Sequence, residues 1–368
     1  MIVERVELRE LQVELNFRFE TSFGVEQDLR KLLLVVHSNG LEGYGEVTAG
    51  TVPGYSYETT ATAWTALVDY VLPRVVGHDF ATPAQLLKAV AGIRGHNMAI
   101  GAVETAFWDL QAKAAGLPLW QLLGGVRTEI AVGASIGIQK SLDETVAVAR
   151  RHAEEGYKRL KFKIKPGWDV EPLRAVRDAL PAMALTVDAN SAYALTDTRV
   201  FQQLDELGLD YIEQPLAHDD LFDHAKLQAG LNTALCLDES VHSAADARKG
   251  LEIDAGRVIN VKVGRLRGHL ESRGVHDVAA AFGAPVWCGG MLELGVGRAH
   301  NLHLSTLANF TLPGDTASAT RYWGDNDIIE EKLDAVDGIQ SLPASGAGLG
   351  VTLRYDLIDK LTVRAEAA

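Results

Sequence analysis

Apolar and polar side chains alternate along the first part of the chain in the way that β-strands require. Apolar residues occupy every second position from 6–15, with one slip in phase at 9–10 that predicts a β-bulge. A second apolar run, 31–37, is followed by Asn39-Gly40 and then by a third run. An Asn-Gly pair between two such runs predicts a tight hairpin.

Helical patterns replace the strands after residue 60. The segments with helical spacing are 60–75, 83–92 and 97–115, the last of which ends at Gly116. Because strands come first and helices follow, we expect residues 1–125 to form an α+β capping domain.

From about residue 128, short apolar runs alternate regularly with amphipathic helices until about residue 315. The candidate strands are 130–137, 158–164, 184–188, 209–213, 234–238, 257–262, 284–288 and 309–312. Such strands, separated by helices, are typical of an α/β fold, the (β/α)7β modified TIM barrel, in which the last helix is reduced. A doubly wound open sheet is the alternative with the same alternation. We place the barrel at residues 126–322.

The last part of the chain leaves this rhythm. Its pattern predicts a strand at 348–353 and a short helix at 357–364. We expect the whole segment 323–368 to pack back on the first domain.

The charge balance excludes some classes of partner. The chain holds 35 Lys and Arg against 49 Asp and Glu, a net charge of −14, which repels phosphate backbones and anionic lipid headgroups. We therefore expect no nucleic-acid and no membrane partner. Cys236 and Cys288 lie in apolar runs and predict buried free thiols in a reducing compartment. The N-terminus is charged and no long uncharged stretch follows, so the expected location is cytoplasmic.

Ionisable residues stand at the C-terminal ends of consecutive candidate strands. They are Lys161 and Lys163, then Asp188, Glu213, Asp238 and Lys262. Barrel enzymes place their active sites at this end of the strands. A single acid there is commonly solvated or capping, but acids that each follow an apolar run would repel one another unless a cation joined them. Oxygen donors without Cys or His favour Mg²⁺ or Mn²⁺ and argue against zinc.

The lysines predict proton transfer. Lys161 and Lys163 are two residues apart on one strand, so they share a face while Phe162 points to the helices. We expect each ammonium group to depress the pKa of the other, which would make a lysine a base near neutral pH. In a closed eight-strand barrel the second and sixth strands lie opposite each other, so Lys163 and Lys262 would flank a metal-bound carboxylate. One lysine could then remove a proton from one face of a carbon while the other returns it to the opposite face. Lys165, which precedes a Pro-Gly pair, is expected beyond the strand and solvated.

Several short motifs carry a resemblance to a known family. They are Lys161-Phe162-Lys163, Val187-Asp188-Ala189-Asn190, Ile212-Glu213-Gln214-Pro215, Leu237-Asp238-Glu239-Ser240 and Asn260-Val261-Lys262. Together with the helical segment 104–125 they resemble the enolase superfamily and, within it, the muconate-lactonising subgroup. The resemblance implies a lid domain that closes over a Mg²⁺ ion, for which Mn²⁺ or Co²⁺ can substitute. It implies that Asp188, Glu213 and Asp238 hold the metal and that Lys163 and Lys262 act as acid and base.

Further segments resemble the group of N-acylamino acid racemases and o-succinylbenzoate synthases. They are 133–137, 165–172, 287–293 and 312–316. Two absences agree: Gly314-Asp315-Thr316 stands where dipeptide epimerases have Asp-x-Asp, and the seventh strand offers no histidine base. The resemblance implies a small-molecule carboxylate substrate and racemisation of N-acyl, in particular N-succinyl, amino acids through an enediolate. The alternative is dehydration to o-succinylbenzoate in menaquinone synthesis, or both activities together. The family also suggests a homo-oligomer, specifically an octamer.

The expected substrate-binding residues fall into two groups. Those on the barrel are Ser135, Lys161, Asn190, Arg265, Gly290 and Met291. Backbone N–H groups near Gly290 could meet an acyl oxygen, and Arg265 could tune Lys262. In the first domain, Phe19, Phe23 and Tyr55, with Phe17 and Tyr57 nearby, are either ordinary core aromatics or the walls of an apolar pocket under a lid.

Two remaining interpretations are less specific. His300 and His303 lie in the helix after the seventh strand rather than at a strand end, which favours packing over a metal site. A catalytically silent barrel that serves as a binding subunit is the non-enzymatic alternative. The complete set of lysines and carboxylates argues against it.

Overall fold

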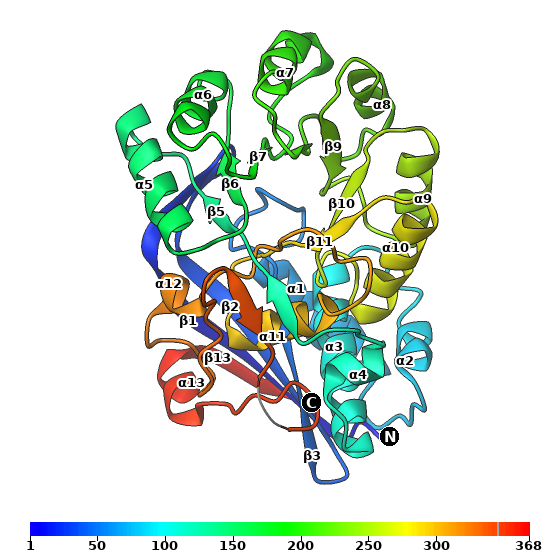
Figure 1. Cartoon of the computed structure of the whole chain (residues 1–368). Coiled ribbons are helices and arrows are strands. Elements are labelled where there is room, and N and C mark those ends of the chain that lie inside the picture. Colours follow the sequence, from blue (N-terminus) through cyan, green and yellow to red (C-terminus); the bar gives the residue numbers. More distant parts are fainter. Residues whose placement is uncertain (344–345) are drawn as a thin grey trace.

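The first layer of the protein is a four-stranded antiparallel sheet in the order β13-β1-β2-β3. The computed structural model describes residues 1–343 and 346–368 (Figure 1). The strands of this sheet are β1 (Arg5–Thr21), β2 (Gly24–Ser38), β3 (Leu41–Val47) and β13 (Thr362–Ala367). Asn39 and Gly40 both have positive φ, 50° and 73°, as a two-residue type I′ turn requires. The predicted hairpin is therefore confirmed.

The break in the apolar alternation at residues 9–10 mainly marks the point where β1 changes the face that it buries. β1 pairs with β2 in unbroken register over residues 5–14, so near residue 10 the register shifts only against β13, between Glu10 and Leu11. The register with β2 shifts later, between Glu14 and Phe19. Residues 6 and 8 lie in the core under the helices of the first domain, whereas residues 11, 13 and 15 lie in the core shared with the barrel. The predicted bulge is thus present against one neighbour alone, because β1 crosses between two packed environments.

Helices cover one face of the sheet. They are α1 (Thr60–Ala66), which continues as π-helical and 3₁₀ turns to Arg74, α2 (Pro83–Ala89), α3 (Asn97–Ala115) and α4 (Leu119–Leu123). α3 ends at Gly116 as predicted, with φ at 67°. It lies directly on β3 because Gly43 and Gly45 have no side chains: a Cβ there would come within 2.1 and 2.0 Å of α3 carbonyl oxygens.

Parallel strands in consecutive order form the barrel sheet, from β5 to β11. The strands are β5 (Ala134–Ile136), β6 (Leu160–Lys163), β7 (Leu185–Asp188), β8 (Tyr211–Glu213), β9 (Ala234–Leu237), β10 (Val258–Val261) and β11 (Val286–Cys288). The helices that follow them are α5 (Leu142–Glu154), α6 (Val170–Ala179), α7 (Thr198–Asp205), α8 (Phe222–Gln228), α9 (Ala244–Glu252), α10 (His269–Ala281) and α11 (Gly295–Leu304). The strand order never reverses, so the predicted barrel with a capping domain is confirmed and the doubly wound alternative is wrong.

The predicted eighth strand, 309–312, does not form. Phe310 makes a single bridge to Val286, and the N–H of Gly133 then donates to the Gly314 carbonyl at 2.8 Å. This segment still closes the barrel between β11 and β5. It stays irregular because the Thr311 N–H bonds the Asn309 carbonyl oxygen within the segment at 2.9 Å, and Pro313 has no N–H to extend a strand ladder.

Other segments also differ from the predictions. The expected strand 130–137 is split into β4 (Glu129–Ala131), which pairs with β12 (Ile339–Ser341), and β5. The expected strand 348–353 contains only isolated bridges, and α12 (Ala319–Trp323) precedes it. The expected helix 357–364 is α13 (Tyr355–Leu361), after which the β-branched pair Thr362-Val363 starts β13. Figure 1 shows β13 beside β1, so the chain returns to the first sheet. The domain boundaries chosen from the sequence remain proposals.

Both cysteines are free and buried, as predicted. Within residues 1–343 and 346–368, no helix is long and apolar enough to cross a lipid bilayer.

Candidate active site

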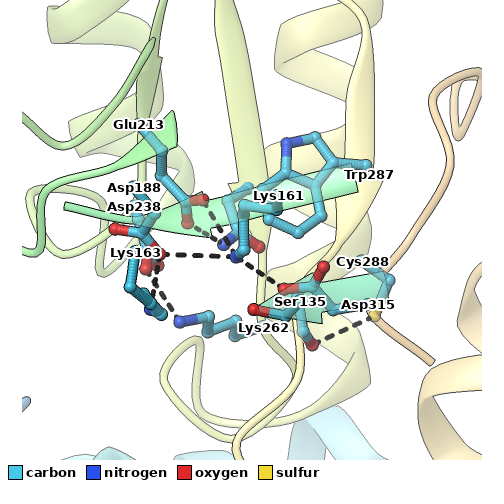
Figure 2. A network of polar contacts seen from close by, with 12 residues as sticks. Ser135, Lys161, Lys163, Asp188, Glu213, Asp238, Lys262, Trp287, Cys288 and Asp315 are labelled. Atoms are coloured by element: carbon cyan, nitrogen blue, oxygen red, sulfur yellow. Dashed lines mark hydrogen bonds and ion pairs between the residues drawn. The ribbon is translucent and has the colours of Figure 1, made fainter. Parts of the chain in front are cut away.

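Ionisable side chains from neighbouring strands converge where the barrel strands end (Figure 2). Lys161 and Lys163 belong to β6, Asp188 ends β7, Glu213 ends β8, and Asp238 and Lys262 follow β9 and β10 directly. In-register pairing places Lys163 beside Asp188 and Asp188 beside Glu213. All three carboxylates are 0% exposed. The structure therefore brings together the lysines and carboxylates that the sequence singled out.

Each carboxylate is paired with a cation. The Lys163 Nζ donates to Asp188 Oδ2 and to Asn190 Oδ1, both at 2.7 Å. The Lys262 Nζ donates to Asp238 Oδ2 at 2.7 Å. Lys163 and Lys262 approach from β6 and β10 with their ammonium groups directed toward one another (Figure 2).

Lys161 occupies the middle of the carboxylate cluster. Its Nζ lies 3.0 Å from Glu213 Oε2, 3.4 Å from Asp188 Oδ2 and 2.6 Å from Asp315 Oδ2. Phe162, between the two lysines, packs into the surrounding apolar core, as predicted. The alternation along β6 thus sends its charges inward.

For Lys161, the predicted lowering of the pKa is not what the protein's own charges produce. Burial lowers the pKa of Lys161, but the carboxylates of Asp315, Glu213 and Asp188 outweigh burial and raise it. The pKa of Lys262 is also raised, against the effect of burial, by Tyr55 and by nearby carboxylates. Burial would raise the pKa of Asp188, yet Lys163 and Lys161 hold it below its usual range. The expectation counted the neighbouring lysine and partial burial, both of which lower the pKa, and ignored acids from other strands.

The donor chemistry of Asp188, Glu213 and Asp238 suits a hard divalent cation. In the part of the chain that the structure describes, however, no group of three His, Cys, Asp or Glu side chains is arranged to hold a metal. Two observations favour an added cation. Burial and the nearby Asp188 raise the pKa of Glu213, and the buried Glu239 Oε2 lacks a hydrogen-bond partner among the described residues. The residues fit a cation in chemistry and charge, while the ligand set stays a prediction.

An apolar cavity leads to the lysines from the capping domain. Phe19, Phe23 and Tyr55 line it together with Lys163 and Lys262. Tyr55 donates its hydroxyl to Asp238 Oδ1 at 2.9 Å, and its ring lies 4.2 Å from the Lys262 Nζ. The structure therefore places these aromatics along the site.

Phe17 and Tyr57, which the sequence grouped with them, are not among the residues that line this cavity. Phe17 packs against Tyr322, with ring centroids 5.5 Å apart, and Tyr57 is 62% exposed.

The remaining expected binding residues surround the same space. Asn190, Gly290 and Met291 line the apolar cavity, and Ser135, Lys161 and Gly290 line an adjoining polar one. Arg265 ion-pairs with Asp238 Oδ1 and hydrogen-bonds the Tyr55 hydroxyl at 3.1 Å. Its contacts therefore run to the partners of Lys262 rather than to Lys262 itself.

Sequence reasoning missed Arg159 and Asp315 as site residues. The Arg159 guanidinium donates to Asp315 Oδ1 at 2.8 Å, and both Arg159 and Lys161 lie over the Trp287 ring, at 4.9 and 4.7 Å. The signal was available, since Arg159 has the same parity as Lys161 and Lys163. Lys165, by contrast, lies beyond the strand, 40% exposed, and pairs with Glu20 at 3.0 Å.

The two histidines have a packing role, as predicted. His300 Nε2 lies 2.8 Å from the Tyr44 carbonyl oxygen, and His303 Nδ1 accepts the Trp120 N–H at 3.0 Å. Both side chains are buried at the junction of the first domain and α11.

Comparisons with known proteins agree with this architecture. Residues 5–124 match the mandelate racemase / muconate lactonizing enzyme N-terminal domain, and residues 144–357 match the enolase C-terminal domain-like family. The chain is 55% identical to an N-succinylamino acid racemase of Thermus thermophilus, over 99% of this chain and 98% of that one. It is 50% identical to an o-succinylbenzoate synthase of Geobacillus kaustophilus, over 96% and 94%. A solved enolase superfamily member from Enterococcus faecalis superposes with a TM-score of 0.93 at 36% identity, over 100% of this chain and 99% of that one.

Proposed function

The chain belongs to the enolase superfamily, and on that premise we propose that it racemises N-acyl amino acids, N-succinyl derivatives in particular, by removing the α-proton. The relative at 55% identity that is named an N-succinylamino acid racemase supports this substrate class. The observation that carries the proposal is the pair Lys163 and Lys262, which line one cavity from β6 and β10.

The two lysines perform the proton transfers. One lysine, in its neutral form, takes the α-proton from one face of the substrate and leaves an enediolate. The other, in its ammonium form, donates a proton to the opposite face, which inverts the configuration. Asp188 and Asp238 each hold the Nζ of one of these lysines in place, at 2.7 Å.

Asp188, Glu213 and Asp238 are the residues that would hold a divalent cation, Mg²⁺ in the first place and Mn²⁺ or Co²⁺ as substitutes. When bound, the cation supplies positive charge that offsets the second negative charge on the substrate carboxylate. Lys161, held by Glu213 and Asp315, adds a fixed positive charge beside these acids.

The two adjoining cavities would bind different parts of the substrate. Phe19, Phe23 and Tyr55 form an apolar wall for the amino-acid side chain. Ser135, Arg298 and Tyr322 line the polar cavity, whose chemistry suits an acyl group that ends in a carboxylate. The protein is further proposed to be a cytoplasmic homo-oligomer, by analogy with the family.

The second candidate function is o-succinylbenzoate synthesis. Relatives at 50% and 49% identity carry that name, and the reaction uses the same lysines. Turnover measured side by side on N-succinyl amino acids and on the dehydratase substrate tests both functions. We expect racemisation that requires a divalent metal; the absence of racemisation with every N-acyl amino acid tried would overturn the first proposal.

A further inference from the structure

A buried lysine of the capping domain reaches a barrel loop at the edge of the site. Lys31, on β2, is 2% exposed and shares the face of Leu29 and Leu33, whose side chains lie in the core shared with the barrel. Its Nζ donates to the Met291 carbonyl oxygen at 2.9 Å. Met291 lies in the loop that follows β11, so this hydrogen bond joins the two domains.

The backbone of Met291 is held at both its N–H and its carbonyl oxygen. Its N–H donates to Glu293 Oε2 at 2.8 Å, and Glu293 Oε1 accepts from Asn301 Nδ2 at 3.0 Å. The next residue, Leu292, has φ at 55°, a left-handed conformation that disfavours leucine. Such residues persist where the surrounding contacts fix the backbone, and they concentrate at functional sites.

Charges from the first domain surround this contact. Glu46 on β3 accepts the N–H groups of Leu294 and Gly297, both at 2.8 Å. Burial lowers the pKa of Lys31, and the carboxylates of Glu46 and Glu293 counteract burial. The glutamates thus compensate the charge of Lys31, while the hydrogen bond itself goes to a backbone oxygen.

The loop forms a wall of the apolar cavity. Gly290, Met291 and Leu292 line it together with the aromatics of the capping domain, and Lys31, bonded to the Met291 carbonyl oxygen, is also among the lining residues. We propose that Lys31 is a positioning residue, which fixes the loop 289–294 with its left-handed Leu292 and so sets the substrate-binding wall from the capping domain. Its kinetic consequence rests on the proposed function; its effect on the loop does not.

Hydrogen–deuterium exchange tests the effect on the loop. In Lys31→Met, amides of 289–294 should exchange about tenfold faster, because a hydrogen bond from a charged donor is lost, while amides of β6 and β8 should stay unchanged. Lys31→Arg keeps a donor and should restore slow exchange. Lys165→Met, which removes an exposed contact between the domains, is the matched control and should leave the loop unchanged. Unchanged loop exchange in Lys31→Met, or an equal rise in all strands, would overturn the proposal.

A double variant separates the hydrogen bond from charge balance. Lys31→Met leaves Glu46 and Glu293 without their buried cation, and adding Glu293→Gln removes one of those charges. If Lys31 acts through Met291, amides of the loop in the double variant should exchange at least as fast as in Lys31→Met. The reason is that both hydrogen bonds of the Met291 backbone, to Lys31 and to Glu293, are then lost or weakened. A return to wild-type exchange would show that only the charge mattered and would contradict the proposal.

Steady-state kinetics test the effect of Lys31 on substrate binding. We expect Lys31→Met to raise KM for an N-succinyl amino acid about tenfold and to change kcat less than about threefold, because the lost interaction shapes binding and not proton transfer. The changes in KM and in kcat should be the same for N-succinylglutamate and for N-succinylglutamine. A loss confined to the glutamate derivative would mean that Lys31 binds the substrate directly, against the proposal. If the wild-type enzyme racemises neither compound, the proposed function fails while the exchange experiment still decides the role of Lys31.

Discussion

At Glu213, burial opposes the charge that the proposed metal binding requires. Burial and the neighbouring Asp188 raise its pKa, so replacing the carboxylate by a neutral amide of the same shape removes a charge that is costly to bury. Metal binding needs the carboxylate. We therefore expect Glu213→Gln to fold with a Tm close to wild type and to lose at least about 100-fold in kcat/KM.

A chelator checks the same assignment without a mutation. Activity should vanish after chelation and return with Mg²⁺ or Mn²⁺. Chelator-treated protein with full turnover would contradict the metal assignment.

Phe23 tests whether the aromatic wall binds the substrate side chain. It is 37% exposed and lines the apolar cavity, so Phe23→Ala should preserve the fold. We expect KM to rise severalfold for N-succinylphenylalanine and hardly at all for N-succinylalanine, because only the larger side chain loses contact. Tyr57→Ala, an exposed aromatic nearby, is the control and should change neither value. Equal effects on both substrates would identify Phe23 as a structural residue.

Single residues were predictable where their chemistry follows from parity along one strand. Lys161 and Lys163 point inward and Phe162 outward because strand side chains alternate. The raised pKa of Lys161 was not predictable in this way, since Asp315 and Glu213 come from other strands. Arg159 was overlooked because it precedes the strand end, although its parity is the same.

Among the elements, α3 and α10 are joined by one buried carboxylate. Glu104 on α3 accepts the N–H groups of His269 and Leu270 at the start of α10, at 2.8 and 3.0 Å. Burial raises its pKa to about 7, although these hydrogen bonds oppose the rise. Between the ordinary value of 4.5 and about 7 the folded state holds a proton that the unfolded state releases. The free energy of unfolding therefore falls as the pH rises through this window.

Replacing this carboxylate should flatten the pH dependence. In Glu104→Gln the proton linkage is absent, so the fall in the free energy of unfolding between about pH 5 and pH 7.5, measured by urea denaturation, should be smaller than in wild type. Glu252→Gln on the surface of α9, where the side chain is 60% exposed, should leave the slope unchanged. Identical slopes for wild type and Glu104→Gln would refute the linkage.

Helices and strands were predictable where local sequence signals are strong. The predictions failed where pairing with distant strands decides whether a strand forms. The hairpin at Asn39-Gly40 and the end of α3 at Gly116 follow from residues that accept positive φ. The eighth strand does not form because the Thr311 N–H bonds Asn309 within the segment and Pro313 cannot extend a ladder beyond it. The strand β13 was missed because its side chains are mostly exposed, so no apolar alternation marks its pairing with β1.

At the scale of the whole molecule, the capping domain supplies one wall of the site and the barrel supplies the charges. Tyr55 bonds Asp238, and Lys31 bonds the loop after β11, so both contacts span the two domains. Sequence motifs predicted the barrel charges well, because strand ends impose their placement. The contacts between the domains could not be predicted, because they depend on how two separately patterned units dock.

The most direct test of the two-lysine account is exchange of the α-hydrogen with D₂O. Lys163→Ala and Lys262→Ala should each abolish racemisation of an N-succinyl amino acid, because inversion needs a base on one face and an acid on the other. Each variant should still exchange the α-hydrogen of one enantiomer, with retention, and the two variants should act on opposite enantiomers. Lys165→Ala should racemise normally. Racemisation near the wild-type rate in either single variant, or equal exchange of both enantiomers by one of them, would contradict the account.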